Sequence, residues 1–373
     1  MFASSATAQR PAMADAPRAI SRQDAIAATL AQGARLALAR AEASAAEASF
    51  FSARIIPNPS ITTEYTKSAP QRHVTLDWPL DLPWLRSRRI GAASEVRSAA
   101  RYRLAFERAA AELDADTAYT QALAARARAR LSEANAAAGD TLLLMARSRQ
   151  RAGDVSELEV KLAEVFAGQQ ANMAAADSEA LDSRLLDLQA AMGLASDAVA
   201  ISLADSLGDP PVDVPGAGAG TPLLVAAAER MERGAELSVR LERANVWQIP
   251  SFIAGFETHD PSGGEPGILP TIGLSIPLPL GNRNRGGIAL AEAERERARA
   301  GLALARVEAR IELVRARRER DGALGRLTRD RALLASAERV AAMSLIAYRE
   351  GAAALPNVLE AQRNAREVMA QYL

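Results

Sequence analysis

The sequence contains no cysteine and only two histidines, His73 and His259. The lack of cysteine excludes a disulfide framework, a thiolate metal site and a thiol nucleophile. Two histidines are too few for most histidine-based metal sites. Aromatic residues make up only 4% of the chain. Together with abundant alanine, this scarcity favours long helices packed side by side over a thick globular core.

An excess of charge is also missing, because 45 Lys and Arg balance 45 Asp and Glu. Balanced charge gives no steering toward nucleic acid, so no nucleic-acid partner is expected. The run from Arg295 to Arg320 alternates arginine with glutamate and has no interleaved aromatics. We interpret it as a solvated, salt-bridged helix face.

Long apolar runs and catalytic motifs are absent as well. No stretch of about 18 apolar residues occurs, so no transmembrane helix is expected. The sequence has no phosphate-cradling glycine motif, no nucleophile elbow and no His-x-x-x-His pair. We therefore predict no catalytic residue, no cofactor and no metal ligand, and the chain is not expected to be an enzyme.

The sequence does contain an internal repeat. Three landmark pairs lie 198 residues apart: Pro79 and Pro277, Ile90 and Ile288, and Gly153 and Gly351. A constant offset indicates elements of equal length between equivalent turns. Each half is therefore predicted to be one strand pair followed by a long helical hairpin.

The boundaries of these halves follow from composition. Residues 1–20 are expected to be a disordered tail or the remnant of a secretory signal, because Ala6-Thr7-Ala8 resembles the end of such a signal. The first repeat covers 21–206 and the second 222–373. The glycine- and proline-rich segment 207–221 is predicted to link them.

Helix and strand signals fall at similar places in both halves. A helix is expected from Ser21, with Asp24 three residues on as a capping box, and it should stop before Pro57. Apolar and polar side chains alternate in the strand candidates that follow. The predicted strands are 55–66 and 73–80 in the first half, and 249–258 and 269–279 in the second.

The alternation in these strands has two possible explanations, of which a soluble sheet is the commoner. Here one face carries large apolar groups and the other carries small or polar groups such as Ser251, Gly255 and Thr271, which fits a lipid-facing exterior and a polar lumen. Four strands cannot pair all their backbone groups in hydrocarbon. Closure needs at least about eight strands, hence two or more copies. We therefore predict a mainly α fold with a four-stranded β contribution to an oligomeric transmembrane β-barrel.

The helical blocks should each contain a tight reversal about 25 residues before the matched glycine. The predicted reversals lie at Ala124–Arg130 and Gly322–Thr328, where Gly322 and Gly325 are the only local breakers. A descending helix from Ile288 to Leu324 would then be roughly 55 Å long.

Several motifs resemble the TolC family of outer-membrane efflux ducts. Arg54-Ile55-Ile56-Pro57-Asn58-Pro59 is similar to the family's entry to its first strand. Tyr348, Gly351 and Val358-Leu359-Glu360-Ala361-Gln362 resemble the signature of its equatorial region. The segment from Pro277 to Ile288 is similar to the strand-to-helix corner of the CzcC-like branch, which serves heavy-metal efflux. The first corner, from Leu82 to Arg89, departs from that form.

The resemblance implies a homotrimer in the outer membrane of a Gram-negative bacterium. Its 12-stranded barrel would contact outer-membrane lipid and continue as a periplasmic α-helical barrel. A periplasmic adaptor protein and an inner-membrane pump of the resistance-nodulation-division type would be its partners. The expected function is the exit duct of a tripartite heavy-metal efflux system, with drug efflux or type I secretion as alternatives.

The resemblance also assigns roles to residues. The corner where barrel meets helices would be formed by Pro79, Pro277, Asn282, Arg283, Asn284 and Arg285. The adaptor would contact a helical tip at Gly322, Leu324, Gly325 and Leu327. Arg326, Arg329 and Asp330 would form a charged periplasmic constriction. Gly153 and Gly351 would form the equatorial turns.

Two rival classes remain open. One is a soluble coiled-coil scaffold in which the strands form a small dimerisation sheet. The other is the periplasmic adaptor itself, although the duplicated strand pair argues against it. The two histidines are interpreted as water-exposed loop residues.

Overall fold

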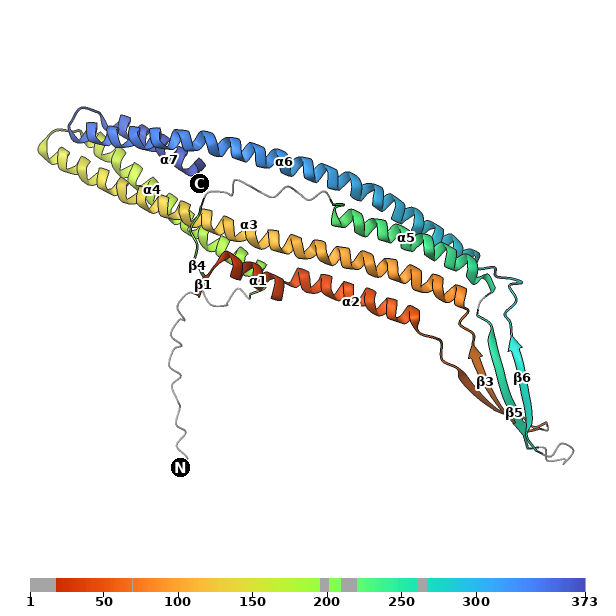
Figure 1. Ribbon diagram of the computed structural model, residues 1–373. Coiled ribbons are helices and arrows are strands. Elements are labelled where there is room, and N and C mark those ends of the chain that lie inside the picture. Colours follow the sequence, from red (N-terminus) through yellow and green to blue (C-terminus); the bar gives the residue numbers. More distant parts are fainter. Residues whose placement is uncertain are drawn as a thin grey trace, which may run out of the picture. The chain divides into compact units, whose positions relative to one another are not determined.

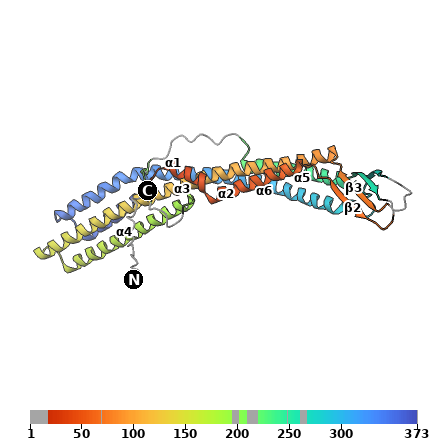
Figure 2. The same cartoon turned by 90° about the horizontal axis from the view of Figure 1, so that it is seen from below.

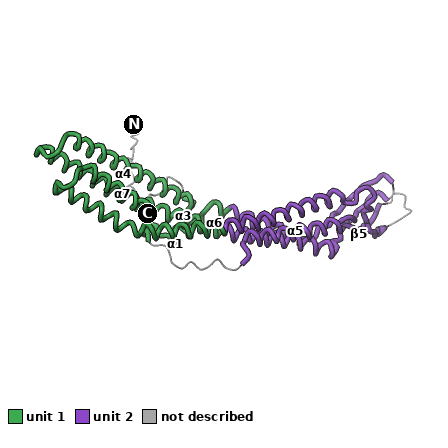
Figure 3. The backbone as a smooth tube through the Cα atoms, turned by 90° about the horizontal axis from the view of Figure 1, so that it is seen from above, with its two compact units in different colours: residues 1–37, 108–217, 314–373 green, residues 38–107, 218–313 purple. Residues whose placement is uncertain are grey.

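The computed structural model describes residues 18–68, 70–194, 201–208, 220–247, 249–259 and 267–372. The chain forms two compact units, coloured separately in Figure 3. Unit 1 comprises residues 1–37, 108–217 and 314–373, and unit 2 comprises 38–107 and 218–313. Each unit draws on both halves of the sequence, so the predicted repeat boundaries do not coincide with compact units.

The two halves share one series of elements, to which the first half adds β1, α1 and β4 (Figure 1). The first contains β1 (Arg18–Ile20), α1 (Arg22–Gln32), α2 (Ala34–Arg54), β2 (Ser60–Tyr65), β3 (Arg72–Pro79), α3 (Pro83–Ala152), α4 (Glu157–Ala191) and β4 (Ile201–Leu203). The second contains α5 (Leu223–Ala244), the short 3-10 helix η1 (Asn245–Trp247), β5 (Ser251–Thr258), β6 (Leu269–Ser275), α6 (Arg285–Arg349) and α7 (Leu355–Tyr372). A helix, a strand pair, a long helix and a shorter helix thus occur twice.

The predicted helix start at Ser21 is confirmed. The backbone N–H of Asp24 donates to the Ser21 hydroxyl at 3.2 Å, and the backbone N–H of Ser21 donates to the Asp24 carboxylate at 3.1 Å. This reciprocal pair is the capping box expected from the two side chains. Gly33 separates α1 from α2, which ends at Arg54, before Pro57 as predicted.

The strand predictions overlap the observed strands: β2, β5 and β6 are shorter than predicted, and β3 is shifted by one residue. β2 begins only at Ser60 because Pro57 and Pro59 cannot donate ladder hydrogen bonds. β6 ends at Ser275, before Pro277. All four strands form one antiparallel sheet in unit 2, in the order β2-β3-β5-β6.

The predicted reversals at Ala124–Arg130 and Gly322–Thr328 are wrong. Both segments lie inside uninterrupted helices, α3 of 70 residues and α6 of 65 residues. At 1.5 Å per residue these helices are about 105 and 98 Å long. A glycine in a helix interior costs only about 1 kcal/mol relative to alanine, so Gly322 and Gly325 weaken α6 without ending it.

The chain reverses instead at the two matched glycines, which end α3 and α6. Gly153 has φ +84° and Gly351 has φ +74°, a left-handed conformation that glycine adopts without a Cβ penalty. In both turns the glycine N–H donates three residues back and the next N–H donates five residues back: Gly153 to Gln150, Asp154 to Arg149, Gly351 to Tyr348, and Ala352 to Ala347. These bonds define two Schellman motifs.

Unit 1 has a hydrophobic cluster built around a second, two-stranded sheet. β1 and β4 pair in parallel, and Ile20, Ile201 and Leu203 pack on Tyr119 of α3 and Leu188 of α4. The prediction of a disordered tail is therefore wrong for Arg18–Ile20, whereas residues 1–17 lie outside the described part. Of the predicted linker, residues 209–219 also lie outside it.

Side chains from α3 fasten this small sheet. The Tyr119 hydroxyl donates to the Ile20 carbonyl at 2.9 Å, and Arg126 donates to the Leu203 carbonyl at 2.7 Å. Burial, and next the hydrogen bond to Asp205, raises the pKa of Tyr119. The backbone N–H of Arg22 and the Tyr119 hydroxyl hold the pKa of Asp205 below its usual range. Two three-residue strands thus persist because α3 satisfies their carbonyl groups.

A second cluster of unit 1 lies beside the two Schellman turns, where α4 folds back along α3 (Figures 1 and 2). Its buried members come from four helices: Leu142, Ala146, Val160, Ala163, Phe166, Tyr348, Leu355 and Val358. Arg366 of α7 is buried nearby, with its guanidinium 4.7 Å from the centre of the Phe166 ring. Burial lowers the pKa of Arg366 to about 10.

Candidate functional site

The four-stranded sheet of unit 2 has two chemically different faces. Its register places Val74 opposite Phe256 and Trp78 opposite Phe252, whereas Thr75 lies opposite Gly255. Because paired residues share a face, the apolar side chains form one continuous surface. We call it the apolar face; it contains Ile61, Tyr65, Val74, Leu76, Trp78, Phe252, Phe256, Ile272 and Leu274.

No other part of the described chain covers the apolar face. Ile272 is 77% exposed and Ile61 is 70% exposed, and no residue of β2, β3, β5 or β6 belongs to the buried core. An antiparallel sheet in a water-soluble protein normally packs its apolar face against a core. An apolar surface of this extent marks an interaction with lipid or another protein.

The opposite face is polar and acidic. In the four strands it carries the carboxylates of Glu64, Asp77 and Glu257, and no Lys or Arg. His73 Nδ1 lies 3.3 Å from Glu257 Oε1, and the Ser251 hydroxyl donates to Asp77 at 3.2 Å. His73 therefore lies within β3 and pairs with Glu257, rather than in a loop.

The strand order leaves both outer strands with an unpaired edge. Among the described residues, β2 pairs only with β3, and β6 pairs only with β5. Such edges present rows of free backbone donors and acceptors that readily pair with another strand. The sheet of one chain is therefore open at both sides.

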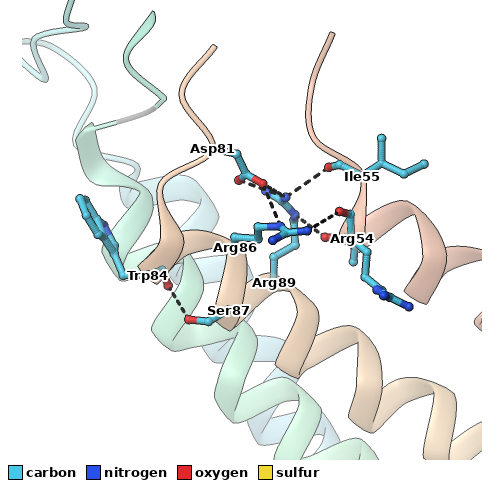
Figure 4. Close-up of polar contacts among 8 residues, drawn as sticks. Arg54, Ile55, Asp81, Trp84, Arg86, Ser87 and Arg89 are labelled. Atoms are coloured by element: carbon cyan, nitrogen blue, oxygen red, sulfur yellow. Dashed lines mark hydrogen bonds and ion pairs between the residues drawn. The ribbon is translucent and has the colours of Figure 1, made fainter.

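A buried carboxylate organises the first strand-to-helix junction, where β3 leads into α3 (Figure 4). The Asp81 side chain is 4% exposed, and it lies 3.0 Å from Arg89 Nη2 and 3.3 Å from Arg86 Nε. Arg89 also donates to the Ala53 carbonyl at 2.9 Å, and Arg86 donates to the Arg54 carbonyl at 3.1 Å. The two arginines thus bind the carbonyl end of α2, where the helix dipole favours positive charge.

The second junction, between β6 and α6, uses an amide. Asn284 has φ +54°, and its Nδ2 donates to the Glu242 carbonyl at 2.9 Å and to the Glu242 carboxylate at 2.7 Å. Glu242 lies near the end of α5, so this junction also ties a preceding helix to a following one. Asparagine is among the few non-glycine residues that adopt positive φ readily.

The predicted corner residues do gather at these junctions. Pro79 is the last residue of β3, and Arg285 is the first residue of α6. The other four, Pro277, Asn282, Arg283 and Asn284, lie in the segment between β6 and α6. Sequence reasoning missed Asp81, Arg86, Arg89 and Glu242, although the charged pattern Asp81-x-x-x-x-Arg86-x-x-Arg89 was visible.

The residues predicted for the helical tip and the constriction lie in the interior of α6. They therefore do not form a tip. Several line an open cavity of about 1540 Å³ in unit 1, facing α1 and α3: Leu324, Arg326, Leu327 and Asp330. Gly322, Gly325 and Arg329 are not among the lining residues.

The Schellman turns are joined by one side chain. Arg149 Nη1 donates to the Tyr348 carbonyl at 3.2 Å, and its guanidinium lies 5.0 Å from the Tyr348 ring centre. Tyr348 is fully buried, and burial raises the pKa of its hydroxyl. The end of α3 is thus bonded to the end of α6.

Two features are absent from the described residues. No helix among them is long and apolar enough to span a bilayer. Nor do His, Asp or Glu side chains in the described ranges come together in threes as a metal site requires.

Comparison with known proteins adds the family context. Residues 268–373 match the family model described as "Outer membrane efflux protein". No curated protein matches the chain. The fold is similar to solved structures over nearly its whole length.

Three of these structures are outer-membrane proteins or channels. The outer membrane protein VceC of Vibrio cholerae is 17% identical, with a TM-score of 0.75, and the match covers 94% of this chain and 91% of that one. The CmeC outer membrane channel of Campylobacter jejuni is 15% identical, with a TM-score of 0.79 and coverage of 94% and 81%. CusC, studied for transmembrane channel formation, is 15% identical, with a TM-score of 0.75 and coverage of 98% and 94%.

The chain therefore has the fold of outer-membrane channels, and its C-terminal part carries the sequence pattern of outer membrane efflux proteins. The predicted resemblance to TolC-family channels is confirmed at this level. The comparisons do not distinguish the CzcC-like branch.

Proposed function

We propose that this protein is the outer-membrane exit duct of a tripartite efflux system, formed when several copies join their sheets edge to edge. The uncovered apolar face carries this proposal. It would face lipid, while the acidic face would line a water-filled lumen. Both free edges, β2 and β6, would pair with neighbouring copies, because hydrocarbon tolerates no unpaired backbone groups.

Three copies would give a closed barrel of 12 strands, as the TolC-like fold implies. Physical closure alone requires at least about eight strands. A soluble coiled-coil scaffold is the main rival. It is disfavoured because it would leave large side chains such as Ile61 and Ile272 in water.

The periplasmic adaptor would dock on the helical reversals, which lie at Gly153 and Gly351 rather than at Gly322 and Gly325. Both turns expose short segments between helices, residues 153–156 and 350–354. An inner-membrane pump would supply the energy. The constriction at Arg326, Arg329 and Asp330 stays a prediction, and two of these side chains line the cavity of unit 1.

Heavy-metal cations are the cargo that we propose. The segment from Pro277 to Ile288 resembles the corner of metal-efflux ducts, and the polar face holds three carboxylates without a Lys or Arg. Rings of carboxylates favour cations in a pore. Drug efflux and type I secretion are the alternatives within the same fold.

The oligomer can be tested by cross-linking, since the natural chain has no cysteine. A double variant with Thr62→Cys in β2 and Thr271→Cys in β6 places one thiol near each sheet edge. A short bismaleimide applied to outer-membrane extracts should yield covalent dimers and trimers. In one chain these strands are separated by β3 and β5, so an efficient cross-link must join two copies.

The single variants Thr62→Cys and Thr271→Cys serve as controls and should remain monomeric on denaturing gels. A double variant that is recovered only from the soluble fraction, without cross-links, would refute the duct. The cargo is tested separately by deleting the gene and measuring tolerance to zinc, cobalt, cadmium, copper and a panel of drugs. Drug hypersensitivity with unchanged metal tolerance would overturn the metal assignment.

A further inference from the structure

The open cavity of about 1540 Å³ in unit 1 is lined by α1, α3, α6, the end of α7 and the segment that follows β4. Sites for small molecules usually measure about 300–1,000 Å³, so this cavity has room for a longer ligand. All of its lining residues belong to unit 1. The cavity therefore lies within one compact unit.

Positive charge predominates in the lining, which contains five arginines and three aspartates. Two of the arginines, Arg130 of α3 and Arg326 of α6, form no hydrogen bond or ion pair within the described part of the chain. The other three are held by neighbouring groups at 2.7–3.1 Å: Arg22 by Asp116, Arg126 by the Leu203 carbonyl, and Arg320 by Asp321. The two long helices thus each contribute one guanidinium group that is free to bind an anion.

Apolar side chains lie among these charges. Leu123 of α3 is buried in the cavity wall, whereas Leu324 of α6 is 46% exposed. Leu327 lines the cavity one turn after Leu324. Exposed apolar surface rimmed by charged groups is typical of a binding site for another molecule. The cavity therefore fits a ligand that carries both apolar and anionic groups.

We propose that this cavity binds an acidic, leucine-bearing peptide segment of a partner protein. Carboxylates of the segment pair with Arg130 and Arg326, because guanidinium groups bind carboxylates through paired hydrogen bonds. Its apolar side chains contact Leu324 and Leu327. A phospholipid fits less well, since its acyl chains would lie against eight charged side chains.

This contact is separate from the docking of an adaptor on the helical reversals. Arg130 lies about 23 residues, or roughly 35 Å along α3, before Gly153. The inference therefore goes beyond the proposed function and adds a second place where a partner is held.

Peptide binding to the full, detergent-solubilised protein tests the proposal. The probe is a short fluorescein-labelled peptide that alternates leucine and glutamate, and its fluorescence anisotropy reports binding. In two matched peptides, serine replaces every leucine or lysine replaces every glutamate. We expect only the leucine–glutamate peptide to bind tightly. A serine–glutamate peptide that binds equally well would show that charge alone is recognised, and would overturn the amphipathic partner.

The two free arginines are tested together. Replacing both Arg130 and Arg326 with Gln should weaken the binding of the leucine–glutamate peptide about three- to tenfold. The matched control is the double variant Arg147→Gln, Arg329→Gln, because both arginines are exposed on the same two helices and neither lines the cavity. The control should bind as the natural protein does. An unchanged affinity in the first double variant, or an equal loss in both, would overturn the site.

Ala323→Trp tests the cavity without a change of charge. Ala323 is an exposed residue of the lining, so the indole ring would occupy the space of the ligand without disturbing a core, and binding should be abolished. Undiminished binding would show that the peptide lies elsewhere. If the natural protein binds none of the peptides, as expected where another copy covers the cavity, the proposal is wrong. These outcomes leave the duct itself untouched, since the cross-linking experiment tests it separately.

Discussion

The first strand-to-helix junction is held by ion pairs, whereas the second is held by an asparagine amide. The repeat offset of 198 residues relates Arg86 to Asn284 and Arg89 to Gly287. Arg86 and Asn284 each donate to a carbonyl at or near the end of the preceding helix, Arg54 in one case and Glu242 in the other. The repeats thus keep one contact and change the chemistry around it.

Gly287 stands where the offset of 198 residues would place the counterpart of Arg89. A Cβ at Gly287 would lie 2.5 Å from Asn284 Oδ1 and 2.8 Å from Glu242 Oε2. The Asn284 amide and the Glu242 carboxylate therefore occupy the space beside Gly287. Each junction therefore bonds a side chain to the end of a preceding helix, although the side chains differ.

Removing the buried carboxylate should have the largest effect. Asp81→Asn leaves Arg86 and Arg89 without a negatively charged partner. We expect the free energy of unfolding to fall by about 2–3 kcal/mol. This is less than the about 3–5 kcal/mol lost when a fully buried pair is broken, because both arginines are partly exposed. The shift in the thermal unfolding midpoint of the detergent-solubilised protein measures it. The control variant Asp154→Asn, at an exposed turn, should leave the midpoint unchanged. Equal midpoints for the two variants would contradict a stabilising role for the ion pairs of Asp81 with Arg86 and Arg89.

Adding one methyl group to the second junction should have the next largest effect. Gly287→Ala forces Asn284 or Glu242 away and breaks their hydrogen bond, at a cost of about 1–2.5 kcal/mol. Its neighbour provides the matched control, because a Cβ at Gly286 meets nothing within 4 Å. Denaturant titration should therefore place Gly286→Ala at or above the natural protein, and the reverse order would refute the close packing.

Alanine at the two Schellman turns should have similar, smaller effects. Gly153→Ala and Gly351→Ala each place a Cβ at positive φ, which costs about 1–2 kcal/mol. If the turns are equivalent, the thermal unfolding midpoints of the two variants should fall by comparable amounts. A loss at only one of them would show that the repeats differ here too.

The smallest effect, of opposite sign, is expected inside α6. Gly322→Ala should stabilise the protein by up to about 1 kcal/mol, because alanine is the better helix former and its Cβ would meet only Arg326 Nη1, at 3.7 Å. Denaturant titration of the variant and the natural protein measures this difference. A clear destabilisation would indicate that Gly322 lies in a helical reversal, as the sequence first predicted.

Much of unit 2 could be predicted from local patterns. Alternation in β3 and β5 gave their positions and faces, since a period of two needs no distant information. The junction contacts could not be predicted, because Arg86 and Arg89 donate to carbonyl groups at the end of α2, some thirty residues earlier. Every residue has a backbone carbonyl, so no residue type in the sequence marks the ones that accept these hydrogen bonds.

The helical reversals were predicted at the wrong positions for a different reason. Gly322 and Gly351 are the same residue type, and only the backbone angle separates a helix interior from a helix end. A usable signal did exist downstream: Ser156 with Glu159 matches the start of a helix, and Pro356 fits the first turn of another. β1 and β4 gave no such signal, since three residues show no period and Tyr119 and Arg126 hold them from α3.

The bond from Arg149 to the Tyr348 carbonyl has a mechanical consequence. It joins the ends of α3 and α6, the two longest helices in the described part of the chain. Because Arg149 couples the two turns, we expect a displacement of one turn to shift the other with it.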